Sequence, residues 1–110
     1  MPKRSRLTRS DFTDLRRAPL RRMSGAYFSL SCTSLPDGES AKAACVVSKK
    51  VAARAVARNR IKRICREAVR AHLSSVKPPQ AFVFTAKRAA AAASPADIRG
   101  DVERLLAAAL

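Results

Sequence analysis

The chain has 110 residues, of which 23 are Lys or Arg and 8 are Asp or Glu, giving a formal net charge of +15. This length fits one small domain, and 47% hydrophobic residues are too many for a wholly disordered basic tail. Such a charge repels itself unless a polyanion neutralises it, which makes a nucleic acid the leading partner. No run approaches the roughly 20 apolar residues of a membrane span, so no membrane partner is expected.

Three cysteines, Cys32, Cys45 and Cys65, are far apart, and each falls within an apolar pattern. We expect free buried thiols in a reducing cytoplasm, because the first residues also lack the apolar core of a secretory signal. No CxxC pair occurs and His72 is the single histidine, which argues against a zinc finger. His72 continues the apolar face of the stretch that precedes it, so we expect its side chain to lie in the core or at the edge of the core.

Carboxylates do not cluster as hydrolytic or two-metal nuclease chemistry requires. They are scattered over expected turns and helices, as Asp37, Glu39, Glu67 and Asp101 show. We therefore predict no catalytic residue and no cofactor bound by the protein alone.

The amino-terminal segment predicts a flexible basic tail over residues 1–9 and a short helix over 11–17. Ser10 is typical of a helix cap, and Pro19 ends the helix. A cationic cluster is expected around the turn that follows, formed by Arg16, Arg17, Arg21 and Arg22.

From Gly25 the hydrophobic period changes to two, which indicates a half-buried strand. One side carries Phe28, Leu30 and Cys32, and the other carries Tyr27, Ser29, Ser31 and Thr33. The turn-forming residues 36–38 (Pro-Asp-Gly) predict that a second strand, over 43–48, pairs back antiparallel.

The central stretch sorts its side chains into two faces and predicts a helix over 55–73. Apolar residues recur at i, i+3, i+4, i+7 and i+8, at Ile61, Ile64, Cys65, Ala68 and Val69. The opposite side is cationic, with Asn59, Arg63, Arg66 and Arg70, flanked by Arg60, Lys62 and Glu67. Arg58 projects nearer the apolar edge, so Arg58 and Arg60 straddle the helix entrance.

Beyond this helix, residues 81–85 are short and β-prone and predict a strand. Residues 86–93 are rich in alanine and fit either a helix or a loop. Ser94 and Pro95 then provide a cap and a first-turn proline for a last helix. Its apolar stripe consists of Ile98, Val102, Leu105, Leu106 and Ala109.

These elements predict an α+β fold, a small two-layer sandwich in the order α-β-β-(β)-α-β-α, in which two helices cover one face of a mixed sheet. We expect residues 1–110 to form a single RNA-binding domain. The other sheet face, with Tyr27, Ser29 and Ser31, is small and polar enough to form a groove.

The exposed side of the central helix is suited to neutralising several phosphates at once. Asn59 either contacts a base or ribose or orients the neighbouring arginines, and both alternatives stay open. A general RNA-binding or ribosome-associated structural protein fits the same charge. Only five aromatic residues argue against recognition built chiefly on base stacking.

The run Arg58-Asn59-Arg60-Ile61-Lys62-Arg63, preceded by residues 47–51 (VSKKV) and followed by Arg66-Glu67, resembles the signature of the bacterial ribonuclease P protein subunit. Residues 6–7 and 11–12 resemble the amino-terminal pattern of the same family. The resemblance implies a protein that binds a catalytic RNA and the 5′ leader of precursor tRNA and promotes endonucleolytic removal of that leader. It also implies catalysis by the RNA with Mg²⁺ in the assembled enzyme, no DNA partner, and a left-handed crossover about the central helix.

Residue by residue, the resemblance assigns two sites. Contact with the catalytic RNA falls on Lys49, Lys50, Arg58, Asn59, Arg60, Lys62, Arg63, Arg66 and Arg70. The leader cleft falls on Phe12, Arg16, Tyr27, Ser29 and Ser31.

The sequence departs from the family pattern at both sites. Arg16 stands where the family can place a second cleft aromatic, and Ser29 and Ser31 occupy strand positions that are bulkier elsewhere. These departures imply that the leader is held more by charge and less by stacking. Ala52 and Ala53 replace residues that are often glycine or polar in the loop before the helix.

Overall fold

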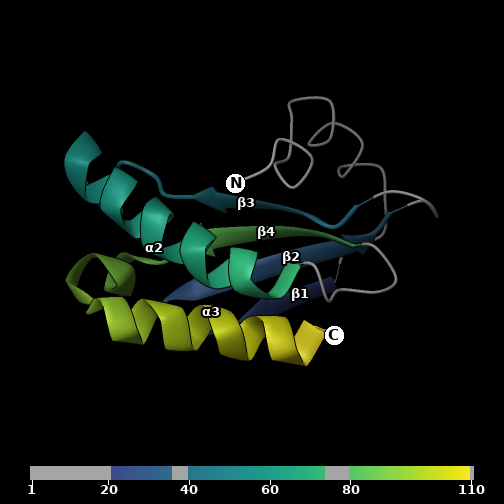
Figure 1. Ribbon diagram of the computed structural model, residues 1–110. Helices are drawn as coiled ribbons and strands as arrows, with labels where there is room; N and C mark the ends of the chain where they lie inside the picture. The colour runs from purple at the N-terminus through teal and green to yellow at the C-terminus, as the bar shows by residue number, and fades with distance from the viewer. Residues whose placement is uncertain (1–20, 36–39, 74–79, 110) are drawn as a thin grey trace.

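The computed structural model describes residues 21–35, 40–73 and 80–109 (Figure 1). The elements in chain order are β1 (Arg21–Ser24), β2 (Phe28–Ser34), β3 (Lys42–Val46), α2 (Ala55–Leu73), β4 (Gln80–Ala86), the 3₁₀ helix η2 (Arg88–Ala92) and α3 (Pro95–Ala109). The predicted amino-terminal tail and helix and the turn at 36–38 lie outside the described residues. No helix in the described ranges is long and apolar enough to cross a membrane.

The four described strands form one mixed sheet in the order β1-β2-β4-β3. β2 pairs antiparallel with both β1 and β4, whereas β3 pairs parallel with β4. The predicted antiparallel pairing of the 43–48 segment with β2 is therefore wrong. β4 lies between β2 and β3, and its Phe82, Phe84 and Ala86 continue the apolar face that Phe28, Leu30 and Cys32 form on β2.

The parallel strands β3 and β4 are joined through α2. In Figure 1 the helices lie toward the viewer, both strands run to the left, and β4 lies below β3. When this view is turned so that both strands point up, β4 lies to the left of β3. The crossover is therefore left-handed, as the family resemblance implied and against the usual preference for right-handed connections.

Both long helices cover one face of the sheet, and the core lies between the layers (Figure 1). Phe28, Phe82 and Phe84 are fully buried from the sheet side. Ile61, Ile64, Cys65, Ala68, Val69 and Leu73 are buried from α2, which begins and ends as predicted. Burial of each large apolar side chain contributes about 1.5–3 kcal/mol. The two-layer α+β prediction is confirmed.

The last helix is capped as its sequence indicates. The Ser94 hydroxyl accepts from the Asp97 backbone N–H at 3.1 Å, and the Asp97 carboxylate accepts from the Ser94 N–H at 3.3 Å. This reciprocal pair satisfies backbone donors that the first helical turn leaves free. The alternative left open for residues 86–93 resolves to the short 3₁₀ helix η2.

The expected cationic turn at Arg21 and Arg22 is instead part of β1, an edge strand. The Arg21 guanidinium donates to Gln80 Oε1 at 2.9 Å and to the Ala109 carbonyl at 3.1 Å. Arg21 therefore joins the sheet edge to the end of α3 and is a structural cation.

The connection between β1 and β2 is held by a carboxylate from α3. Asp101, only 1% exposed, accepts hydrogen bonds from the backbone N–H groups of Ala26, Tyr27 and Phe28 at 2.9–3.0 Å. Lys87 donates to the Gly25 carbonyl at 2.7 Å and to the Ser24 hydroxyl in the same turn. These bonds fix where β2 begins.

Candidate nucleic-acid interface

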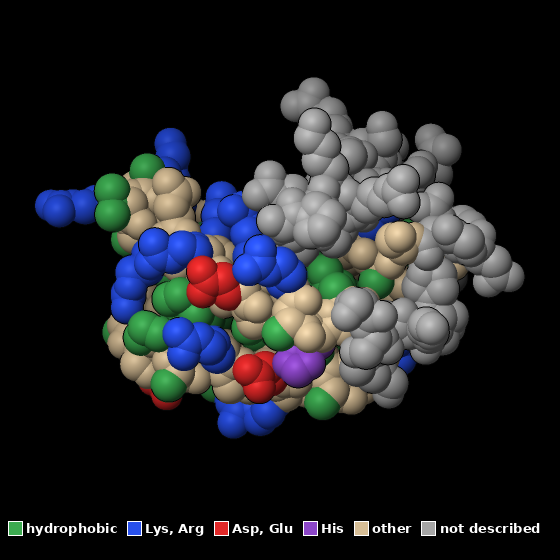
Figure 2. All heavy atoms as spheres, in the orientation of Figure 1, with side chains coloured by type: hydrophobic (Ala, Val, Ile, Leu, Met, Phe, Trp, Pro, Cys, Tyr) green, Lys and Arg blue, Asp and Glu red, His purple; other side chains and the backbone are tan. Residues whose placement is uncertain are grey.

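The outward side of α2 is a polycationic surface. Its exposed side chains on this side are Asn59, Arg60, Arg63, Arg66, Glu67 and Arg70, with Lys62 half-buried beside them. Figure 2 shows Lys and Arg side chains (blue) gathered over α2. Glu67 is the sole acidic residue of α2, so the positive charges of this surface are poorly compensated within the helix.

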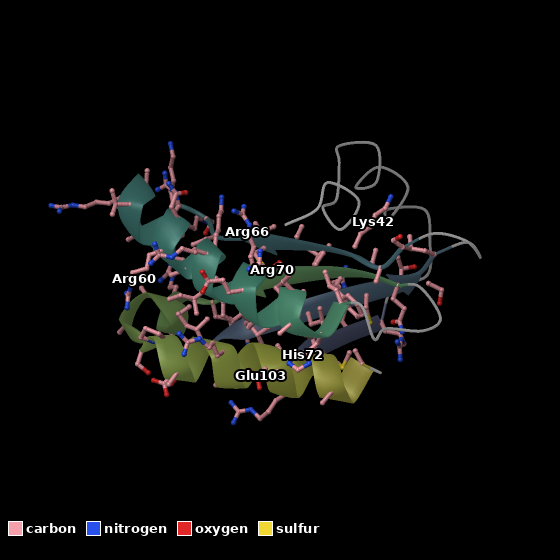
Figure 3. The ribbon with its side chains drawn as sticks, viewed as in Figure 1. Lys42, Arg60, Arg66, Arg70, His72 and Glu103 are labelled. Atoms are coloured by element: carbon pink, nitrogen blue, oxygen red, sulfur yellow. The ribbon has the colours of Figure 1, made fainter. Side chains whose placement is uncertain are left out.

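Four residues of this surface enclose a shallow hollow. Arg63, Arg66, Glu67 and Arg70 line a cavity of about 180 Å³. They lie at i, i+3, i+4 and i+7, which brings them onto one helical stripe. Figure 3 shows Arg66 and Arg70 on the side of α2 toward β3. Three guanidinium groups around one hollow provide fork-shaped donors suited to phosphate oxygens.

Arg58 has a different position from the other arginines. Its Nη1 donates to the carbonyls of Ala52 and Ala53 at 3.0 and 2.7 Å. The side chain therefore fixes the loop before α2, as its predicted place at the helix entrance allows. Its structural contribution is to hold that loop against the first turn of the helix.

This loop carries the two predicted lysines, Lys49 and Lys50, both exposed. The backbone N–H groups of Val51 and Ala52 both donate to the Ser48 carbonyl, at 3.1 and 3.2 Å. The loop is thus a tight turn that accommodates alanine at positions 52 and 53. It places Lys49 and Lys50 ahead of the positive end of α2.

The second predicted site lies on the sheet face opposite the helices. Ser29 and Ser31 are half-buried there, as alternation with Phe28 and Leu30 requires. The register adds neighbours that sequence analysis missed, because pairing partners cannot be obtained from periodicity. One row consists of Ser24, Ser29, Thr85 and Val46, and the next of Arg22, Ser31, Val83 and Ala44.

The remaining predicted cleft residues are not brought into these rows. Tyr27 directly precedes β2 and packs partly against the hydrophobic core. Phe12 and Arg16 lie outside the described residues, so their place in a cleft stays a prediction. The floor that the structure describes is made of small and hydroxyl-bearing side chains with Arg22 at one edge.

His72 is exposed, so it is an edge residue and not a core residue of α2. Figure 3 shows it on the side of α2 that faces α3, close to Glu103. Among residues 21–35, 40–73 and 80–109 no group of three or more His, Cys, Asp or Glu side chains could hold a metal ion.

A two-layer α+β domain with a polycationic helix on one side and a small-residue sheet face on the other defines a protein of the nucleic-acid-binding class. The comparison with known proteins is more specific. The family model for ribonuclease P matches residues 1–110. The chain belongs to the ribonuclease P protein family and is a protein component of ribonuclease P.

Two relatives and two solved structures illustrate the similarity. The ribonuclease P protein components of Thioalkalivibrio sulfidiphilus and Acidothermus cellulolyticus are 37% and 40% identical, over 96% of this chain and 87% and 88% of theirs. A mutant Staphylococcus aureus RNase P protein superposes with a TM-score of 0.85 at 25% identity, covering 97% of this chain and 89% of that one. The Thermotoga maritima RNase P protein shares the fold, with a TM-score of 0.75 at 21% identity over 92% and 94%.

Proposed function

We propose that this chain binds the catalytic RNA of ribonuclease P through α2 and the preceding loop, and the 5′ leader of precursor tRNA through the sheet face opposite the helices. The protein thereby promotes endonucleolytic removal of the leader in the cytoplasm. Catalysis belongs to the RNA and the Mg²⁺ ions of the assembled enzyme, and the protein supplies positioning and charge neutralisation. The observation that carries the proposal is the separation of α2 into a buried apolar side and an exposed arginine side.

The charge of α2 supports contact with a folded RNA. Arg60, Arg63, Arg66 and Arg70 are all exposed along one helix, with Lys49 and Lys50 leading into it. Each cation that neutralises a phosphate releases condensed counterions, so several together give strong, salt-dependent binding. Asn59 stands between two arginines and offers an amide that both donates and accepts hydrogen bonds.

The sheet face opposite the helices supports the binding of an extended strand. Ser29, Ser31 and Thr85 offer hydroxyl groups but little bulk, and Arg22 adds a positive charge at the β1 edge. Such a floor fits a sugar-phosphate backbone better than stacked bases, because stacking requires aromatic faces. Leader binding is therefore expected to depend mainly on charge and hydrogen bonding.

The direct test is cleavage of precursor tRNA at low Mg²⁺ by the cognate catalytic RNA, alone and with the full-length protein. We expect the protein to increase turnover, because it replaces part of the charge neutralisation that Mg²⁺ otherwise supplies. Turnover that does not change on addition of the protein contradicts the proposal.

A second measurement isolates the leader site. Ser31→Trp adds bulk to the sheet face opposite the helices and is expected to weaken binding of precursor tRNA while leaving mature tRNA and catalytic RNA unaffected. Ala107→Trp, at an exposed position of α3 outside both proposed surfaces, is the matched control. Equal losses for precursor and mature tRNA would exclude a leader role for this face.

A further inference from the structure

Two cysteines from different elements meet in the core beneath the arginine face. Cys45 of β3 and Cys65 of α2 have their Sγ atoms 2.7 Å apart and share a hydrogen bond. Cys65 is fully buried, whereas Cys45 retains 8% exposure. Cys32 is also buried but lies on β2, which β4 separates from β3 in the sheet.

The distance between these thiols is close to that of a covalent bond. A disulfide has an S–S length of about 2.05 Å, so sulfurs now 2.7 Å apart need to approach by only about 0.65 Å. α2 already packs on β3, so the two residues are in contact in the reduced protein. The cross-link would join residues 20 positions apart in the chain.

We propose that Cys45 and Cys65 form an oxidation-sensitive pair, which a hydroperoxide converts into a disulfide that ties α2 to β3. This inference goes beyond the proposed function and does not depend on it. Neither thiol belongs to the arginine surface or to the sheet face opposite the helices.

The oxidation proceeds in two balanced steps. The Cys45 sulfur attacks one oxygen of hydrogen peroxide, the O–O bond breaks, and the thiol proton leaves with the other oxygen as water. The resulting sulfenic acid is then attacked by the Cys65 sulfur, which forms the S–S bond and breaks the S–O bond. The Cys65 proton leaves with that hydroxide as a second water, so two thiols and one peroxide give one disulfide and two waters.

The surroundings of the two sulfurs determine which thiol reacts with peroxide and which one then forms the disulfide. Cys45 is oxidised first because it retains some exposure, while Cys65 is enclosed. The hydrogen bond with Cys45, and next to it burial, raises the pKa of the Cys65 thiol. Cys65 therefore has little thiolate available to react with peroxide. It reacts with the sulfenic acid of Cys45 because the two sulfurs are in direct contact, and it gives its proton to the leaving hydroxide as the S–S bond forms.

The bond would constrain the loop that carries Lys49 and Lys50 together with the first half of α2. Closing a loop of this size in the unfolded chain stabilises a folded protein, because it lowers the entropy of the unfolded state. We expect oxidation to raise the melting temperature of the free protein by roughly 10 °C. A dithiol reductant should reverse the shift.

The experiment treats the full-length protein with hydrogen peroxide, denatures it, alkylates the remaining thiols and maps peptides without reduction. The expected result is a Cys45–Cys65 disulfide with Cys32 alkylated. Three alkylated cysteines, a disulfide that includes Cys32, or Cys45 oxidised to sulfinic acid without a cross-link would each overturn the proposal.

Matched alanine variants provide the controls. Cys32→Ala should keep both the cross-link and the rise in melting temperature, and Cys45→Ala should abolish both. A rise in melting temperature that persists in Cys45→Ala would show that the stabilisation has another origin. The wild-type peptide map decides the existence of the bond even if a variant fails to fold.

Discussion

The Asp101 carboxylate accepts hydrogen bonds from three successive backbone N–H groups, those of Ala26, Tyr27 and Phe28. Arg104 lies 3.3 Å from the same carboxylate, but its side chain is 72% exposed, so this ion pair contributes little. The sequence contained a signal for the role of Asp101, because a carboxylate stands among Ile98, Val102 and Leu105 on the apolar stripe of α3. A charge on a buried stripe indicates a fixed partner.

Replacement of Asp101 should destabilise the protein strongly. Asp101→Ala leaves three backbone donors without their acceptor, and we expect a loss of about 3–5 kcal/mol in the free energy of unfolding. Urea unfolding of the free protein measures the change. Asp97→Ala is the control, because its carboxylate only caps an exposed helix end and should cost at most about 1 kcal/mol. Equal losses in the two variants would contradict the role given to Asp101.

Two glycines should respond to alanine with opposite signs. A Cβ at Gly25 would lie 2.5 Å from Asp101 Oδ1, so Gly25→Ala should displace the carboxylate and cost about 1–3 kcal/mol. A Cβ at Gly100 meets nothing within 4 Å, so Gly100→Ala should stabilise α3 by about 0.5–1 kcal/mol. Urea unfolding of both variants tests the pair, and a stabilising Gly25→Ala would refute the close approach.

At the level of elements, the bounds and the two faces of α2 could be predicted closely, because both are determined by residues within the helix itself. The apolar spacing sets the buried side, and no proline or glycine interrupts residues 55–73. The same spacing places Arg63, Arg66 and Arg70 outward, so this part of the candidate site was also accessible from sequence.

An acidic residue on the buried side of α2 should unfold the protein. Ile64 is buried against the sheet, so Ile64→Asp places an unpaired carboxylate in the core and should abolish the cooperative melt followed by circular dichroism. Val56, on the same helix, is 80% exposed, so Val56→Asp should preserve a cooperative melt. A normal melt for Ile64→Asp would mean that the helix faces the other way.

The partner of β3 could not be predicted, because a period of two fixes which face of a strand is buried but not which strand lies beside it. The turn residues between β2 and β3 favoured a hairpin, yet β3 pairs with β4, which follows a whole helix later. The left-handed crossover also goes against the general preference. The neighbours of Ser29 and Ser31 on the sheet face opposite the helices depend on this pairing, so they could be identified only from the structure.

Across the whole molecule, positive charge serves two purposes. Arg21, Arg58 and Lys87 bond to oxygen atoms of the chain itself and hold the ends of elements in place. The arginines on the outer side of α2 instead face outward with Glu67 as their only acidic companion on that helix. The net charge of +15 over the chain disfavours the free protein through self-repulsion and favours a polyanion-bound state.

The dependence of RNA affinity on salt separates these two purposes. Arg66→Ala removes an exposed guanidinium from the α2 hollow, so the slope of log affinity against log salt concentration should become shallower by roughly one unit if Arg66 neutralises one phosphate. Arg99→Ala, at an exposed position of α3, should leave the slope unchanged. Filter binding of the catalytic RNA over a series of salt concentrations gives both values. Since both variants lower the net charge equally, a similar change in each would show that the protein responds to total charge, whereas a change confined to Arg66 locates the RNA on α2.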